Sequence, residues 1–586
     1  MLKFLEPKQA KYTGKIAETV DFVTEMQLKD KKLWKQFAEQ YRLRPDGKDK
    51  GWRGEFWGKM MRGGCLIFSY SGDEELYSAL EYAVCALLET QDEKGRFSTY
   101  TVDSEFCGWD MWCRKYVLTG LQHFYRICND SALKNKILTA MRLHADYICE
   151  RIGEGKLDIR KTSHIYGGVN SCSILEPFVE LYKLSQDKKY LDFAEYILAT
   201  GGCADGSLFE CVENRVLPYQ YPTRKAYETM SFFEGVLAYY EVTGNEKYFS
   251  LVERFVEDVY ETDVTVIGCS GCAHELFDNS SNSQTAQVDW LMQETCVTVT
   301  WMRLLFRLHL LTGDAKYVER IERAGVNAMW GSLNTEKQLQ YSTEKKVWLS
   351  PLPFDSYSPL AYNKRGRGIG GFREFEEGGF YGCCACIGSA GVAIMPLVAV
   401  LQADDGVIIN SYSSGTVTAK TPNGNNVCFV FERDPLKGKT KLTVKCSEEE
   451  RFTIKLRKPE WSRSFTLSSR EIQEEKDDYI SITDVWKEQT LTVDLDVSLR
   501  KEIRNGKTAF LYGDIVLALD NAKNKYDFEQ ELDFLGGEIL PHEKGEQIRY
   551  QMTTIDGKKY IFTDYASCGK GWENENSKVS VWLNVK

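Results

Sequence analysis

The sequence has 586 residues and a formal net charge of −11, with 43% hydrophobic and 27% charged residues. This composition is typical of a globular protein with two to four domains, at about 150 residues per domain. An acidic chain without a basic stripe excludes nucleic acids and anionic membrane surfaces as partners. Residues 1–8 lack the apolar core of a signal peptide, and no run of about 18 apolar residues occurs, so we expect a cytoplasmic protein without a membrane span.

Residues 15–402 have mostly helical periodicity, and their clearest feature is a repeated junction. At each junction a helix ends, a polar or glycine turn follows, and a new helix begins with Tyr190, Tyr248 or Tyr317 near its start. The intervals are about the length of a helical hairpin with its loops. Repeated hairpins over so long a segment predict a closed (α/α) toroid, with an open solenoid as the alternative. Segments 262–290 and 354–382 are expected to be long loops that line a cleft.

After about residue 403 the periodicity changes to that of short β-strands separated by turn residues. The strand-like runs lie at 407–419, 427–431, 442–444, 452–456, 479–482, 491–495, 508–519 and 560–565. We therefore expect a mainly α protein with β, in which a toroid is followed by one or two β-sandwiches. The predicted domains are a catalytic toroid at 1–402, a β-sandwich at 403–500, and, at 501–586, either a second β-rich domain or part of the same sandwich.

Residues 378–388 (GGFYGCCACIG) hold three cysteines in four positions between glycines. Upstream, Glu294 and Cys296 are two positions apart, so that one irregular turn can aim a carboxylate and a thiol at one point. Together with Cys383 and Cys384 they suit Zn²⁺, a tetrahedral and borderline-soft cation. Adjacent cysteines require a strained backbone, which argues against a merely structural zinc. The alternative is that these cysteines are small core residues.

The 18 cysteines are scattered through helix-like segments without a disulfide framework, so free thiols in a reducing compartment are expected.

Five motifs resemble those of the glycoside hydrolases typified by bacterial β-L-arabinofuranosidase, family 127 and its close relative family 146. They are 293–296 (QETC), 357–360 (YSPL), 383–384 (CC), 456–461 (LRKPEW) and 510–513 (FLYG). The resemblance implies an (α/α)6 barrel followed by β-sandwich domains, in agreement with the periodicity. It also implies zinc bound by Glu294, Cys296, Cys383 and Cys384, with Cys383 attacking the sugar as a thiolate.

The same resemblance implies an acid/base and several sugar contacts. Residues 274–277 (HELF) resemble the family's Gly-Glu-x-Phe, so Glu275 is the expected acid/base; a solvated loop glutamate is the alternative. The segment 163–168 (SHIYGG) supplies a further histidine as a sugar contact. The expected substrate-binding residues are His164, Tyr357, Arg114, Lys225 and His274.

Arg114 and Lys225 stand where the family has histidines that line the sugar pocket. If both face the cleft, the pocket is more cationic, and an acidic sugar becomes a suitable substrate through charge-assisted hydrogen bonds. Charged residues on a helix surface are the alternative.

These observations predict a retaining glycosidase that removes a terminal sugar from a small-molecule or oligosaccharide glycoside. The sugar is β-L-arabinofuranose or a related, acidic one. Two alternatives stay open: a non-catalytic sugar-binding or scaffold toroid with a structural zinc, and a lyase or isomerase that acts on uronates. A homodimer also stays open.

Overall fold

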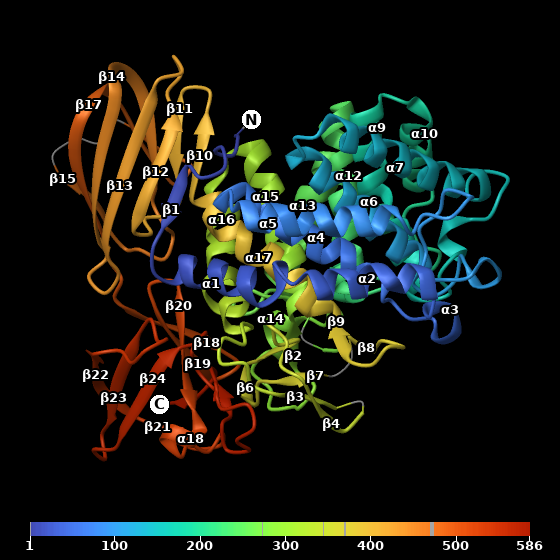
Figure 1. The fold of residues 1–586 in the computed structure, drawn as a ribbon. Coiled ribbons are helices and arrows are strands. Elements are labelled where there is room, and N and C mark those ends of the chain that lie inside the picture. Colours follow the sequence, from blue (N-terminus) through green and yellow to red (C-terminus); the bar gives the residue numbers. More distant parts are fainter. Residues whose placement is uncertain (1, 272, 344, 369–370, 469–473) are drawn as a thin grey trace.

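In the computed structural model, a helical part is followed by two β-rich parts that lie along one side of it (Figure 1). The structure describes residues 2–271, 273–343, 345–368, 371–468 and 474–586. Apart from β1 and β6, the strands of the two large sheets all begin at or after Val400. The expected order, helices first and sheets second, is confirmed. No helix in the described ranges is both long and apolar enough to cross a bilayer.

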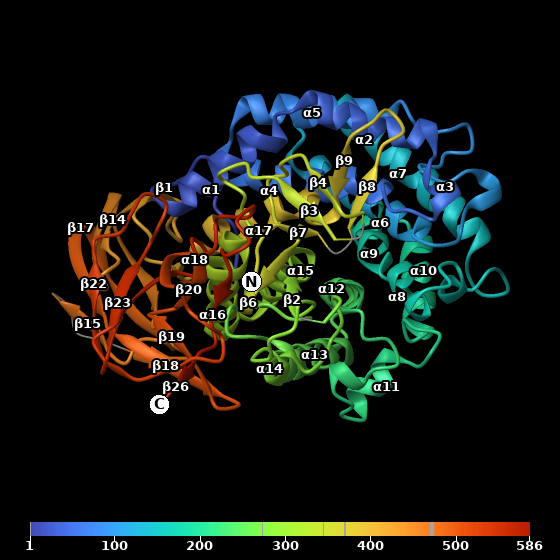
Figure 2. The same ribbon diagram turned by 90° about the horizontal axis from the view of Figure 1, so that it is seen from below.

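Within the described chain, six inner helices form a closed ring (Figure 2). Each inner helix packs against the next, and α17 packs against α4, which closes the ring and excludes an open solenoid. The inner helices are α4 (Gly54–Ser71), α6 (Asp110–Ile127), α9 (Leu175–Ser185), α12 (Ala226–Thr243), α15 (Thr295–Thr312) and α17 (Cys383–Ala399). Their outer partners are α5 (Glu74–Leu88), α7 (Ser131–Arg151), α10 (Lys188–Ala199), α13 (Glu246–Asp263), α16 (Ala315–Ala324) and α1 (Lys15–Val23).

The repeated junctions follow from helix capping. Gly244 and Gly313 end the inner helices α12 and α15 in the left-handed conformation, at φ 65° and 74°. The next residue, Asn245 or Asp314, accepts a hydrogen bond from a backbone N–H of the outer helix. Such a cap stabilises a helix by about 1 kcal/mol, which is why each junction turns the chain sharply into the next helix.

The first large sheet has strand order β1-β12-β13-β14-β11-β10, and the long antiparallel strands β14 (Lys439–Arg457) and β17 (Tyr479–Leu495) form its longest pair. The second has order β18-β19-β20-β24-β23-β22. The remaining strands of these sheets are β10 (Val400–Ala403), β11 (Gly406–Ile409), β12 (Gly415–Lys420), β13 (Asn426–Asp434), β15 (Phe465–Ser468), β16 (Glu474–Lys476), β18 (Leu499–Arg504), β19 (Lys507–Tyr512), β20 (Ile515–Asp520), β22 (Phe534–Leu540), β23 (Arg549–Thr554), β24 (Lys559–Asp564) and β25 (Val579–Ser580).

Two segments of the helical part join these sheets. Strand β1 (Ala10–Tyr12) pairs with β12, and β6 (Ala361–Asn363) pairs with β25. The division into 1–402, 403–500 and 501–586 stays a prediction, because two strands from the first of these segments belong to the sheets of the other two.

Short strand pairs lie across one end of the helical ring in both views (Figures 1 and 2). Strand β2 (Met292–Glu294) pairs with β5 (Tyr357–Pro359), and β8 (Phe372–Glu374) pairs with β9 (Phe380–Gly382). Strand β2 runs directly into α15 and β9 runs directly into α17. The first residues of these two neighbouring inner helices therefore meet at this end of the ring.

Candidate metal centre and active site

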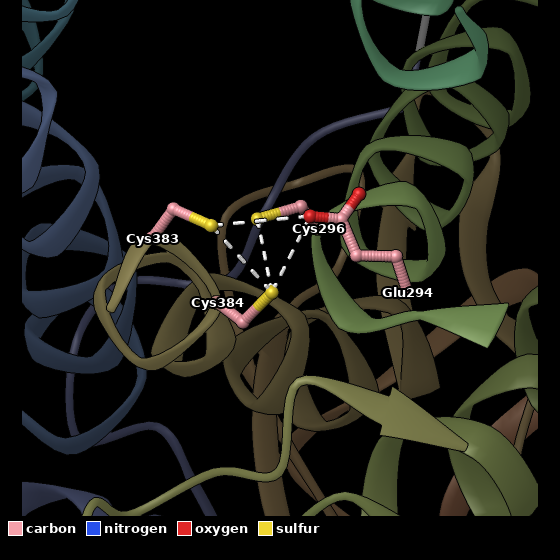
Figure 3. Close-up of side chains that lie close together, drawn as sticks. All are labelled: Glu294, Cys296, Cys383 and Cys384. Atoms are coloured by element: carbon pink, nitrogen blue, oxygen red, sulfur yellow. Dashed lines mark hydrogen bonds between the residues drawn. The ribbon is translucent and has the colours of Figure 1, made fainter. Parts of the chain in front are cut away.

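The four expected metal ligands converge at the start of α15 and α17 (Figure 3). Glu294 ends β2, Cys296 is the second residue of α15, and Cys383 and Cys384 are the first two residues of α17. The two cysteines have a helical backbone, so the strain expected for adjacent ligands is not found. Successive helix residues point about 100° apart, and this angle lets both thiols reach the same centre.

The ligand atoms have the separations that a tetrahedral ion requires. The Sγ atoms of Cys296 and Cys384 are 3.5 Å apart, and those of Cys383 and Cys384 are 3.8 Å apart. Oε1 of Glu294 lies 3.5 Å from Cys384 Sγ and 3.9 Å from Cys383 Sγ. Sulfur and oxygen ligands at ordinary zinc distances, tetrahedrally arranged, lie about 3.6–3.8 Å apart. The donor set fits zinc in both chemistry and spacing.

Glu294 leaves a polar atom without a partner. Its Oε2 is buried and has no hydrogen bond within the described residues, and the whole residue is 3% exposed. Burial raises the pKa of Glu294, and the negative charges of Glu275 and Cys383 raise it further. A buried carboxylate beside three thiols is stable in ionised form only when a cation compensates the charge. This orphaned oxygen is the structural sign that the cluster is suited to a metal ion.

A lysine that the sequence analysis missed lies beside the cluster. Lys59 of α4 is 1% exposed, and its Nζ lies 2.8 Å from Glu55 Oε1 and 3.7 Å from Cys296 Sγ. The ammonium also lies 4.6 Å from the ring centroid of Tyr227, a favourable cation–π distance. The sequence contained one indication of this lysine: it is a charged residue in a helical segment in which the neighbouring residues are mostly apolar or glycine.

Cys383 differs from the other three ligands in access and ionisation. It is 8% exposed, against 1% for Cys384 and 0% for Cys296. Hydrogen bonds with the Cys296 and Cys384 thiols, together with the Lys59 and Lys225 ammonium groups, outweigh burial and hold the pKa of Cys383 well below its usual value. Burial raises the pKa of the other two thiols. Low pKa and access are the properties of a nucleophilic cysteine.

Glu275 lies in a tight turn next to the cluster. His274 and Glu275 have left-handed backbone conformations, with φ 51° and 66°, which cost about 1 kcal/mol or more each and are common at functional sites. The Glu275 carboxylate forms an ion pair with Lys225 and accepts a hydrogen bond from the Tyr357 hydroxyl at 2.6 Å. Because Tyr357 is the β-sheet partner of Glu294, a single side chain links Glu275 to the metal centre.

The charge of Lys225 is compensated within the protein. Burial alone would lower the pKa of Lys225, but Glu275, Glu228 and Glu294 outweigh burial and raise it well above the usual value. Its Nζ lies 5.4 Å from the ring centroid of Tyr166, which is 39% exposed. Tyr166 therefore lies at the solvent-exposed side of the site. It was not among the residues expected from the sequence.

The histidines expected to contact the sugar lie on the same side. His164 is exposed and lies two residues before Tyr166. The ring of His274 stacks on Trp290, with centroids 5.9 Å apart. Neither histidine touches the cysteine cluster in the contacts of the described residues.

Arg114 is placed differently from the expectation. Its side chain is fully buried in α6, and the guanidinium donates to Asp110 at 3.0 Å and to Glu105 at 2.7 Å. It also lies over the ring of Phe106, 4.9 Å from the centroid. Since two carboxylates neutralise it, Arg114 is a structural ion pair and does not make the site cationic. The expected pocket for an acidic sugar thus has no free cation at either Arg114 or Lys225.

Comparison with known proteins places this geometry in a family. The model of the β-L-arabinofuranosidase GH127 catalytic domain matches residues 7–348, and that of the GH127 middle domain matches residues 406–498. Glu275, Glu294 and Cys296 lie within the first match, and Cys383 and Cys384 lie between the two. No curated protein matches the sequence.

Solved structures share the whole fold at low sequence identity. A GH127 β-arabinofuranosidase is 17% identical with a TM-score of 0.76, over 100% of this chain and 98% of that chain. The GH127 β-L-arabinofuranosidase Ara127N from Geobacillus stearothermophilus T6 is 17% identical with a TM-score of 0.72, over 98% of this chain and 100% of that one. With the catalytic-domain model matching more than half of the sequence, the chain belongs to the GH127 family of glycoside hydrolases.

Proposed function

We propose that this glycoside hydrolase removes terminal β-L-arabinofuranose with retention of configuration, using Cys383 as the nucleophile. The observation that carries the proposal is a thiol of lowered pKa, the least buried of a cluster of four possible metal ligands next to Glu275. The sugar is taken from the GH127 relatives, which are named β-L-arabinofuranosidases. The buried ion pairs of Arg114 and Lys225 argue against an acidic sugar in this site.

Glu294, Cys296, Cys383 and Cys384 would hold zinc in this proposal. When bound, zinc lowers the pKa of its cysteine ligands and keeps them ionised at neutral pH. The support is the donor set, its tetrahedral spacing and the unpartnered Oε2 of Glu294.

The reaction has two displacements. In the first, the Cys383 Sγ attacks the anomeric carbon, a C–S bond forms, and the glycosidic C–O bond breaks as the leaving oxygen takes a proton from Glu275. In the second, water attacks the anomeric carbon, Glu275 takes a proton from that water, and the C–S electron pair returns to Cys383. Two inversions at one carbon give net retention.

Lys225 and Tyr357 position Glu275 for this role. Both donate to its carboxylate and so fix the orientation of its two oxygens.

The test is the activity of Cys383→Ala on an aryl β-L-arabinofuranoside, with Cys386→Ala as the matched control. Cys386 lies on the same helix, is fully buried and is outside the cluster. We expect no turnover from the first variant and near wild-type turnover from the second. A sugar-mimicking electrophile should label Cys383 in the wild type, as mass spectrometry would show.

Turnover retained in Cys383→Ala would refute the cysteine nucleophile. A zinc-loaded wild type with neither turnover nor labelling would favour a binding or scaffold protein. An unsaturated, ultraviolet-absorbing product from a uronate glycoside would favour a lyase.

A further inference from the structure

A cavity of about 670 Å³ lies where the helical part meets both β-rich parts. Its walls come from residues 13–18 near the N-terminus, from the short helix η6 (Gly325–Met329) and the ring helix α17, and from residues 542–548 of the C-terminal part. The volume lies within the range of about 300–1,000 Å³ that is typical of small-molecule sites, which often occur between domains.

Arg433 of β13 (Asn426–Asp434) lines this cavity with an uncompensated charge. Its Nε is buried without a partner, and no ion pair or hydrogen bond to its guanidinium is formed by the described residues. Burial lowers the pKa of Arg433, and the negative charge of Glu322, which forms no ion pair with Arg433, only partly opposes this effect. An arginine fork without an anion is unusual, because the guanidinium is suited to bidentate binding of a carboxylate or phosphate.

The acidic residues of the cavity wall are already paired inside the protein. Glu322 shares Arg457 with Glu319, the Oδ1 of Asp514 binds Arg323, and Glu543 and Glu546 share Arg549. The lysines of the wall, Lys15 and Lys544, have no ion pair among the described residues, and the same holds for one exposed acid, Glu18. Because the wall acids other than Glu18 already have partners and the Arg433 guanidinium has none among the described residues, Arg433 is suited to a negatively charged occupant.

Two further wall residues offer hydrogen bonds. Asp514 is 5% exposed and its Oδ2 has no partner, and Trp330 is 6% exposed and its indole Nε1 has no partner. Trp461 and Tyr512 add aromatic surface. The Asp514 oxygen and the Trp330 indole can bind hydroxyl groups of a ligand, and the two aromatic rings can pack against its C–H groups. Together with the Arg433 cation, they suit a hydroxylated ligand that carries one anionic group.

We propose that this cavity is a second ligand site that binds an anionic monosaccharide, with Arg433 on its carboxylate or phosphate group. It is separate from the metal centre: no ligand of the metal cluster lines it, and its contact on α17, Met395, lies about 18 Å along the helix from Cys383. The site goes beyond the proposed arabinofuranosidase activity and does not depend on it.

The test is isothermal titration of the zinc-loaded enzyme with D-glucuronate, D-glucose 6-phosphate and D-glucose. The titrations use constant ionic strength, because exposed charges are screened by salt. The protein is compared as wild type, Arg433→Met and Arg451→Met. Arg451 is an exposed arginine of β14 that lies outside the cavity, so it controls for the loss of one positive charge.

We expect saturable binding of at least one anionic sugar, at least tenfold tighter than D-glucose. Affinity should fall at least tenfold in Arg433→Met and stay unchanged in Arg451→Met. Binding of glucuronate alone identifies a carboxylate ligand, and binding of the sugar phosphate alone identifies a phosphate. Equal affinity in wild type and Arg433→Met, or no saturable binding of either anion, would overturn the proposal.

Discussion

At the scale of single residues, the four members of the Glu/Cys cluster differ in burial and ionisation. Cys384 and Cys296 are fully buried with raised pKa values, whereas Cys383 is more accessible and has a lowered pKa. In the proposed zinc site, Cys296 and Cys384 are therefore buried ligands whose loss affects the metal. Cys383 is the proposed nucleophile, and its loss affects turnover directly.

Cys384→Ala removes a direct ligand of the proposed zinc ion and leaves only three. Zinc affinity should therefore fall by more than the 10- to 100-fold that is typical when a residue behind a ligand is lost. Competition with a chromogenic chelator measures this, and Cys386→Ala is the control. Zinc affinity equal to that of the wild type would show that Cys384 is not a ligand.

Glu275→Gln removes proton transfer but keeps the shape of the side chain. We expect a loss of about 10²- to 10⁴-fold on alkyl arabinofuranosides and a smaller loss on nitrophenyl arabinofuranoside, whose leaving group needs little protonation. Steady-state kcat/KM on both substrates measures the difference, with Glu261→Gln, an exposed glutamate of α13, as the control. Equal losses on both substrates would move the acid/base role to another residue.

At the scale of elements, α15 is joined to the first sheet through a buried histidine. His309 Nδ1 lies 3.0 Å from the carbonyl oxygen of Asp314, and Nε2 lies 2.9 Å from the amide nitrogen of Asn410. An amide nitrogen can only donate, so Nε2 is the acceptor, and the neutral tautomer protonated at Nδ1 satisfies both contacts. Burial lowers the pKa of His309 to about 4.

This histidine predicts acid destabilisation. Between about pH 6.5 and 4 the unfolded chain binds a proton at position 309 that the folded chain does not. The free energy of unfolding therefore falls by about 1.4 kcal/mol per pH unit, or about 3 kcal/mol in total, as the pH drops through this window. Above pH 6.5 this residue contributes no pH dependence.

Urea unfolding at several pH values measures the effect. His309→Gln cannot titrate and should reduce the slope between pH 6.5 and 4 by about 1.4 kcal/mol per pH unit, whereas His542→Gln, at an exposed position, serves as the control. An identical slope in His309→Gln and the wild type would contradict this assignment.

At the scale of the whole molecule, a buried ion-pair network locks the helical ring to the first sheet. Arg457 of β14 is fully buried; it donates to Glu319 at 2.6 Å and to Glu322 at 2.5 Å, both on α16, and to the carbonyl oxygen of Asn410 at 2.7 Å. Arg457→Met leaves two partly buried carboxylates without their cation. We expect a loss of about 3–5 kcal/mol in the free energy of unfolding.

Thermal and urea unfolding measure this loss, and Arg451→Met on the same strand is the matched control. Little change in Arg457→Met would mean that water or neighbouring groups compensate the two carboxylates, and that the network does not hold the two parts together.

Local sequence patterns determined the elements and the ligand set. The helical hairpins were predictable because a cap and a 3.6-residue period depend only on neighbouring residues, as at Asn245 and Asp314. The cluster of Glu294, Cys296, Cys383 and Cys384 was predictable because thiols and a carboxylate have few other uses in such motifs, and the family resemblance pointed to the same four residues. Strand limits were less predictable: the runs 442–444 and 452–456 are parts of the single strand β14.

Tertiary structure alone decided which charges are free. Arg114 and Lys225 looked equivalent in the sequence. In the structure, Arg114 forms ion pairs with Asp110 and Glu105, whereas Lys225 forms an ion pair with Glu275, the expected acid/base. Lys59 beside Cys296 and the unpaired Arg433 were not foreseen at all. Burial and charge pairing arise from residues that are distant along the chain, and no local pattern encodes them. By itself the sequence therefore determined the helical and sheet elements, the family and the residues of the Glu/Cys cluster. Only the folded chain decided which charged side chains are paired and which are not.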